Sequence, residues 1–190
     1  MNEVAMKIEN IVNGVNVDDV GELIGNIAQD ASLGASRFRL TNKWVRGGNN
    51  QSRVTGFYSG GQDHEHLQEF TIEADEPPVL AGNDLAANPV EYLLSSLAAC
   101  LTSALVYHAA VRGIEIRALE AKVEGDLDLR GFLGMSDEVR RGFEGIRVEY
   151  QIDTDAEDLE ALRELMLFSP VYDVTTNGTN VELSITRIQP

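Results

Sequence analysis

A long apolar stretch with helical signals limits the folds that this chain can adopt. It begins at Asn88-Pro89, a favourable N-cap and first helical residue, and continues to Arg112 before Gly113. From Val90 to Arg112 such a helix would rise by roughly 34 Å. Its residues are apolar on almost every side, and a helix of this kind belongs in a protein core. We therefore expect it to be a core element. Because the short alternating strands of the sequence are too few to cover it within one subunit, we also expect an obligate homodimer.

Length, charge and cysteine content narrow the class of protein. The 190 residues suffice for one domain with an N-terminal appendage. The apolar stretch carries Glu91 and His108, so we do not interpret it as a membrane span and expect no membrane partner. A formal net charge of −16 repels phosphate backbones, which argues against nucleic acid as a partner. The single cysteine excludes an internal disulfide and the N-terminus lacks a secretory signal, so we expect a cytoplasmic protein.

Apolar periodicity predicts an α+β domain at residues 36–190, preceded by a helical extension at residues 1–35. In the extension, Asn16 or Asp18 is the expected helix cap. Alternation of apolar and polar residues predicts antiparallel strands with one wet face. In chain order we expect strands at Arg37–Trp44, Ser52–Tyr58 and Leu67–Ile72 with a hairpin turn at residues 47–50, then the long helix, strands at 119–129 and 146–152, a helix at Asp155–Phe168 and a strand at Val181–Ile188.

Cys100 lies in the middle of the long helix, where two interpretations are open. Burial among leucines would make it an inert packing residue, because free cysteine is among the most buried residue types. Helical geometry, however, places Ser96, Ser103 and Tyr107 on the same side as Cys100. That face is more polar than a core seam and could line a cleft that shelters a reactive thiol.

Two motifs carry a resemblance to a known family. The first comprises Asp75-Glu76-Pro77, the loop to Gly82, Asn88-Pro89-Val90-Glu91-Tyr92-Leu93-Leu94 and Ala98-Ala99-Cys100; the second comprises Ser169-Pro170-Val171-Tyr172 and the strand expected at Val181–Ile188. Together they resemble the osmotically inducible protein C / organic hydroperoxide resistance (OsmC/Ohr) family. The resemblance implies an OsmC-like fold, with an antiparallel or mixed sheet packed on a long, central, buried helix. It also implies an intertwined homodimer with active sites at its interface.

As the resemblance implies, the peroxidases of this family attack a hydroperoxide with a thiolate, and a second cysteine resolves the sulfenic acid as a disulfide. An arginine and a glutamate hold the thiolate and orient the peroxide. Cys100 matches the reactive cysteine. Ser169 stands at the position of the second cysteine, where a helix N-cap before Pro170 is a complete structural explanation for it.

The arginine and glutamate positions also depart from the family pattern. Val90 occupies the glutamate position, and Glu91 lies one residue further, about 100° around the helix, where a capping box explains it. Asn49 occupies the arginine position. Arg46 and Arg53 flank it and could reach the same space, although exposed strand charge explains both as well.

We therefore expect thiol-based reduction of organic hydroperoxides, or of related small electrophiles, in oxidative-stress protection. Without a positive partner the thiol of Cys100 should stay mostly protonated, and without a second cysteine an external thiol reductant must reset it. The candidate site residues are Cys100, Arg46, Arg53 and Glu91, with Ser96, Ser103 and Tyr107 as its pocket. The alternative is a protein that keeps the fold and binds a small apolar ligand at the dimer interface without turnover. We expect no cofactor.

Histidines are the remaining candidates for chemistry. His64 and His66 would share one strand face and could hold a metal, but no clear third ligand is nearby. We therefore interpret residues 63–66 as a solvated loop and expect no metal site. His108 lies some 12 Å along the helix from Cys100, too far to be the thiol's base within one chain. We expect it to be a core or interface histidine.

Overall fold

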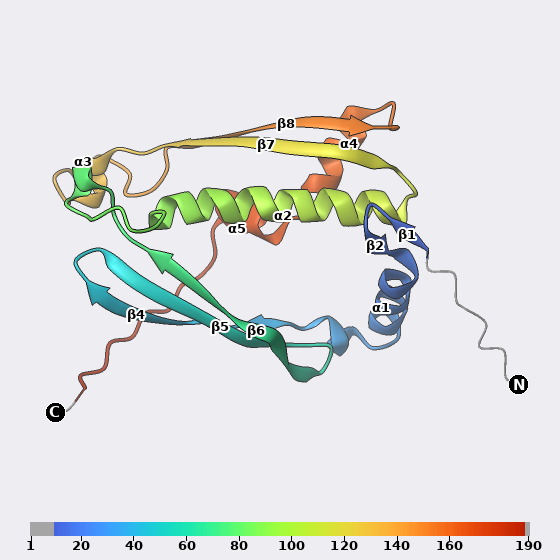
Figure 1. Ribbon diagram of the computed structural model, residues 1–190, viewed down its shortest axis with the longest axis horizontal. Helices are drawn as coiled ribbons and strands as arrows, with labels where there is room; N and C mark the ends of the chain where they lie inside the picture. The colour runs from blue at the N-terminus through green and yellow to red at the C-terminus, as the bar shows by residue number, and fades with distance from the viewer. Residues whose placement is uncertain (1–9, 189–190) are drawn as a thin grey trace, which may run out of the picture.

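The computed structural model describes residues 10–188, which form an α+β structure arranged about one long helix, α2 (Figure 1). In chain order the elements are β1 (Ile11–Val12), β2 (Val15–Asn16), α1 (Val17–Gln29), the 3-10 helix η1 (Ala31–Gly34), β3 (Arg37–Phe38), β4 (Thr41–Arg46), β5 (Asn49–Ser59), β6 (Gln62–Ala74), the 3-10 helix η2 (Pro78–Leu80), α2 (Pro89–Val111), β7 (Ile116–Asp126), α3 (Leu129–Phe132), β8 (Gly145–Thr154), α4 (Leu159–Met166) and α5 (Pro170–Asn177). In Figure 1, α2 runs between the β7–β8 pair above and the β4–β5–β6 sheet below. The predicted α+β class is confirmed.

The local sequence signals that predict α2 also mark its two ends in the structure. Asn88 Oδ1 accepts a hydrogen bond from the Glu91 backbone N–H at 2.9 Å, and Glu91 Oε2 accepts one from the Asn88 N–H at 2.8 Å. This reciprocal pair is the predicted capping box. At the other end, Gly113 has a φ of 70°, which ends the helix in a conformation that favours glycine.

Only one side of α2 is buried within the chain. The helix packs on β7, α4 and α5, and the buried side chains on it are Leu97, Leu101, Leu105, Ala109 and Ala110. The opposite side carries exposed residues, among them Ser96, Ser103 and Tyr107, the last of which is 53% exposed. One chain therefore covers only one face of this helix, and its burial at the centre of an intertwined homodimer stays a prediction. By length and a mean hydropathy of 1.5 the helix also has the composition of a membrane span, as the core helices of soluble proteins do.

The core of the chain lies between α2, the β7–β8 pair and α4. Its centre is formed by Leu105, Leu162 and Leu165, with half-buried residues of β7 and β8 packed around them. The two strands pair antiparallel, with Val123 opposite Val148, and one face of each strand is half-buried while the other is exposed. The alternation predicted for both strands is confirmed. β7 nevertheless ends at Asp126, because Asp128 caps the short helix α3 through a bond from the Arg130 N–H.

The N-terminal sheet is far more exposed. β5 pairs antiparallel with β3, β4 and β6, and the predicted hairpin turn lies between β4 and β5. Every residue of β4 is exposed, including Trp44, at 68%. β6 is longer than predicted and includes residues 63–66, so the prediction of a loop there is wrong. Gly60 and Gly61, both at positive φ, make the turn that returns the chain along β5.

The first helix, α4 and the C-terminal segment differ in how closely they follow the prediction. α1 is present and Asn16 caps it, although a short β1–β2 hairpin precedes it and residues 1–9 lie outside the described part. The helix predicted at 155–168 is shorter, since Asp158 caps α4. Val181–Ile188 forms no strand within residues 10–188, and Leu183 is 91% exposed. The division of the chain at residue 35 stays a prediction.

A buried carboxylate joins the N-terminal sheet to α2. Asp75 directly follows β6 and has no exposed surface. Its oxygens accept hydrogen bonds from the backbone N–H groups of Glu76, Asn83 and Leu85, at 2.9, 3.2 and 3.3 Å. Burial raises the pKa of Asp75, but these three bonds and the positive charge of Arg46 outweigh burial and hold the pKa below its usual range. The loop before α2 is thus folded around one ionised side chain.

The same loop requires a glycine where it folds back on itself. A Cβ at position 82 would lie 1.7 Å from the carbonyl oxygen of Glu76, which is far inside any van der Waals contact. Gly82 therefore permits the close approach of backbone that brings Asn83 and Leu85 to the carboxylate of Asp75.

We predict that Asp75→Asn lowers the melting temperature by several degrees at neutral pH and by less in acid. A carboxyl group with a lowered pKa in the folded state contributes stability above its unfolded pKa of about 3.9. That contribution disappears as pH falls through the folded pKa, so the wild-type and variant curves should converge below about pH 4. Thermal unfolding at a series of pH values measures this. The exposed Asp137→Asn is the control, and a constant difference at every pH would contradict the prediction.

We also predict that Gly82→Ala destabilises the fold by about 1–3 kcal/mol, the usual cost of forcing extra atoms into a closed space. Urea unfolding measures the free energy of unfolding. Gly21→Ala, in α1, is the matched control: nothing lies within 4 Å of its added Cβ, and alanine favours a helix. Equal effects of the two substitutions would show that position 82 is not closely packed.

Candidate functional site

Cys100 lies half-buried at the edge of the uncovered face of α2. Ser96, Ser103 and Tyr107, the residues predicted to share its side, are all exposed. Among the described residues no hydrogen bond or ion pair involves the Cys100 Sγ, so nothing within residues 10–188 holds a thiolate there. Cys100 is thus a free, partly exposed cysteine beside the open side of the helix.

The pocket expected around Cys100 is not closed within one chain. Ser96 donates its hydroxyl to the Leu93 carbonyl at 2.9 Å, a bond within its own helix. A large apolar cavity instead lies on another side of α2, where Leu97, Leu101 and Leu105 line it. The polar pocket predicted around Cys100 would need a second surface over α2, and it stays a prediction.

Arg46 and Glu91 occupy the end of the molecule where α2 begins. Glu91 lies nine residues before Cys100, about 14 Å along the helix axis, and its carboxylate is engaged in the capping box. Arg46 ends β4, and its charge acts on Asp75. Neither residue is shown beside Cys100, so their predicted role at the thiol stays a prediction.

Arg53 is part of the surface of the N-terminal sheet. Its guanidinium lies 3.6 Å from the carboxylate of Glu69, and both side chains are largely exposed. An exposed pair of this kind contributes little to stability. Within one chain Arg53 is thus an exposed strand charge, and its role at the thiol of Cys100 stays a prediction.

Asn49, Val90 and Ser169 stand at the positions where the sequence differs from the family pattern, and each is buried or half-buried. Asn49 is buried and donates to the Ala74 carbonyl at 3.2 Å, which ties β5 to the end of β6. Val90 is half-buried in the first turn of α2. Ser169 is 1% exposed and its hydroxyl accepts the Tyr172 N–H at 3.0 Å, so it caps α5 as predicted.

The histidines also have packing roles. His108 stacks on Phe168 with ring centroids 4.3 Å apart, and burial, together with the nearby charge of Arg112, lowers its pKa. His64 and His66 both lie on β6 and contact the ring of Phe57, each at 5.1 Å between centroids. No group of three or more metal-binding side chains occurs within residues 10–188.

Two polar residues near α2 were missed at the sequence level. Asp75 was noted only as part of a motif, and nothing local shows that three backbone groups would converge on it. Tyr150 donates its hydroxyl to the Ala98 carbonyl at 3.0 Å and lies 3.1 Å from the Thr102 hydroxyl; burial raises its pKa. The alternation of residues 146–152 places Tyr150 on the inner face of its strand, which is the one available signal.

Comparisons with known proteins agree on the fold. A crystal structure of a putative osmotic stress induced and detoxification response protein from Psychrobacter arcticus is 16% identical, with 73% of this chain and 88% of that chain covered and a TM-score of 0.55. An OsmC like protein from Mycoplasma pneumoniae gives the same identity and TM-score, with 74% and 88% covered. An OsmC-like protein of unknown function from Vibrio cholerae is 12% identical, with 73% and 93% covered and a TM-score of 0.53.

A search of curated proteins gave no match. Residues 82–184, however, match the family described as OsmC-like protein, and this segment contains α2 with Cys100, the β7–β8 pair, α4 and α5. The match extends over more than half of the sequence. The chain therefore belongs to the OsmC-like protein family.

Proposed function

We propose that this OsmC-like protein reduces organic hydroperoxides, or related small electrophiles, through Cys100 as part of protection against oxidative stress. The observation that carries the proposal is the position of the thiol. Cys100 is half-buried on the side of α2 that the chain leaves open, among the hydroxyl groups of Ser96, Ser103 and Tyr107. A small molecule can reach the sulfur there, whereas a packing cysteine would lie among the buried leucines of the opposite side.

The reaction that this site would perform is a two-electron transfer from sulfur to peroxide. The Cys100 thiolate attacks one peroxide oxygen, the O–O bond breaks, and the departing alkoxide takes a proton to become an alcohol. Cys100 is left as a sulfenic acid. One external thiol then displaces water to form a mixed disulfide, and a second external thiol releases Cys100 together with the oxidised reductant.

The external reductant follows from the sequence, since the chain has one cysteine. Ser169 caps α5 and offers no sulfur for an internal disulfide. A reducing cytosol would supply small thiols in excess, and we place the protein there. Because no positive group is shown beside Cys100, turnover should be slow.

We further propose that the protein is a homodimer. The chain of 20.8 kDa exposes 14579 Å² of surface, whereas a compact monomer of this mass exposes about 8,900 Å². Many exposed apolar side chains lie on the N-terminal sheet, on the open face of α2 and in residues 181–188, and others lie on α1, around α3 and on α4. A second copy that covers these surfaces would also close the pocket over Cys100, where Arg46 or Arg53 of one subunit could approach the thiol of the other.

We predict that cumene hydroperoxide is consumed slowly in the presence of dithiothreitol and that Cys100→Ser reduces the rate to that of buffer. Dimedone should label the wild-type protein at Cys100 after exposure to peroxide, because it traps sulfenic acids. Ser95→Ala, an exposed position on another side of α2, is the control and should keep the wild-type rate. A wild-type rate equal to buffer, without dimedone labelling, would reject the enzyme and leave the alternative of a protein that binds an apolar ligand without turnover.

We predict a mass of about twice 20.8 kDa in sedimentation at low micromolar concentration. Trp44→Glu should weaken the dimer by about tenfold or more, since it replaces a large exposed apolar side chain of β4 with a charge. Lys43→Glu, on the other face of the same strand, is the matched control. A folded monomer of the wild-type chain would contradict the proposed homodimer.

A further inference from the structure

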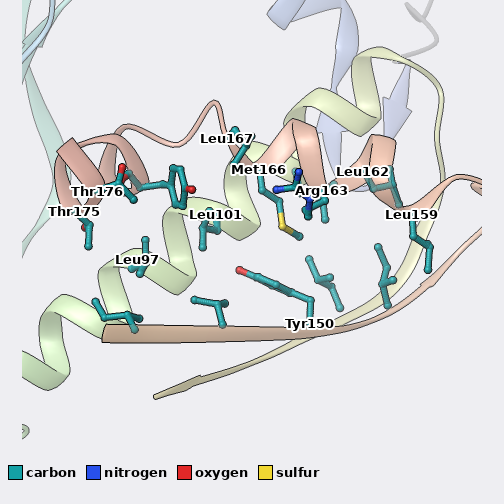
Figure 2. A pocket seen from close by; sticks show the side chains of 16 residues that line it. Leu97, Leu101, Tyr150, Leu159, Leu162, Arg163, Met166, Leu167, Thr175 and Thr176 are labelled. Carbon is teal, nitrogen blue, oxygen red and sulfur yellow. The ribbon is translucent and has the colours of Figure 1, made fainter. Parts of the chain in front are cut away.

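A cavity of about 480 Å³ lies between α2, β8, α4 and α5 (Figure 2). Leu97, Leu101 and Leu105 form its wall on α2, and Leu162 with Met166 form its wall on α4. Three of these side chains, Leu97, Leu105 and Leu162, are no more than 3% exposed. Part of the wall is therefore the chain's own core, while Leu159, at 57% exposed, lies at the open rim.

Two threonine hydroxyls of the cavity are arranged to accept a hydrogen bond from a ligand. The hydroxyl of Thr175 donates to the Val171 carbonyl at 2.6 Å, and that of Thr176 donates to the Tyr172 carbonyl at 2.8 Å, which leaves their oxygens as acceptors. The Tyr150 hydroxyl donates to the Ala98 carbonyl. Figure 2 shows the two threonines at one end of the cavity and Tyr150 across from Leu101.

The charges around the cavity disfavour an anionic ligand. Arg163 is the one basic side chain among the lining residues, and its guanidinium pairs with Glu160 at 2.7 Å and with Glu164. Two carboxylates around one guanidinium leave this rim negative, and the chain as a whole carries a net charge of −16. An acid would meet repulsion at the entrance.

An apolar space of this size beside the core, partly open to solvent, has the character of a small-molecule site. Apolar cavities of about 150 Å³ already bind molecules such as benzene. Water is a poor occupant here, because the walls are mainly leucine, isoleucine and valine.

A small molecule is a better candidate for the occupant of the cavity than a second copy of the chain or the C-terminal segment. Most of the surface that the proposed dimer would cover, on the N-terminal sheet and the open face of α2, does not line the cavity; Leu159 and Leu167 are the exposed apolar residues at its rim. The segment after α5 leaves on the side of α2 that faces β4 to β6, away from β8 (Figure 1).

We propose that this cavity is a binding site for a small uncharged molecule with an apolar body and one hydroxyl group, such as a medium-chain alcohol. The apolar part lies among the leucines, and the hydroxyl donates to the oxygen of Thr175 or Thr176. The site is separate from Cys100, which lies about 100° around α2 from Leu101. It does not rest on the proposed thiol chemistry.

The test uses the intact protein and the uncharged dye Nile red, whose fluorescence rises in an apolar environment. Saturable binding is expected, with displacement by decanol and at least tenfold weaker displacement by decanoate, which has the same chain length and a negative charge. Cys100→Ser should leave the titration unchanged, since the thiol lies outside the cavity.

The decisive comparison is between two valines that face each other across the β7–β8 pair. Val148 lines the cavity, whereas Val123, its cross-strand neighbour, does not. Val148→Phe fills the space and should weaken Nile red binding by about tenfold or more, while Val123→Phe should not. If Val148→Phe does not fold, Leu167→Trp, at a more exposed position of the lining, takes its place as the blocking variant. Absence of saturable binding, equal effects of the paired variants, or equal displacement by decanoate would overturn the proposal.

Discussion

The structure depends on one imbalance: α2 has more apolar surface than the rest of a single chain covers. The helix is apolar on nearly every side, yet β7, α4 and α5 cover only the side that carries Leu97, Leu101 and Leu105. Exposed apolar surface is costly in water, and the N-terminal sheet adds more of it. This imbalance accounts for two features together. It leaves Cys100 open to small molecules, and it leaves a broad surface for a second copy of the chain.

The positions at which this chain departs from the peroxidase pattern are not simply empty. Asn49 connects β5 to the end of β6, and Ser169 holds the first turn of α5. Each residue stands where the family resemblance implies a group that acts on sulfur, and each stabilises the backbone instead. The chain thus keeps the thiol and the scaffold of the family. A slow, thiol-dependent reaction and a separate apolar cavity are both compatible with such a scaffold.

Local signals account for what could be predicted from the sequence. The ends of α2 and the start of α1 follow from Asn88, Asn16 and Gly113, which act on backbone within a few residues. Predictions that depend on distant partners did less well. Val181–Ile188 has the alternation of a strand, but alternation does not supply a neighbouring strand to pair with. Asp75 and the cavity were missed for the same reason, since each is assembled from segments that only the folded chain brings together.

The strand pairing has a consequence for how this protein reaches its final form. β4, β5 and β6 are joined by consecutive hairpins, and β7 pairs with β8, the next strand in the chain. Most pairings therefore join segments that are close in sequence. Contacts of this kind form quickly, because little loop entropy is lost in closing them. If the open surfaces are covered only when two chains meet, the slow step of refolding is an encounter between subunits. Its rate would then rise with protein concentration, which separates it from steps within one chain.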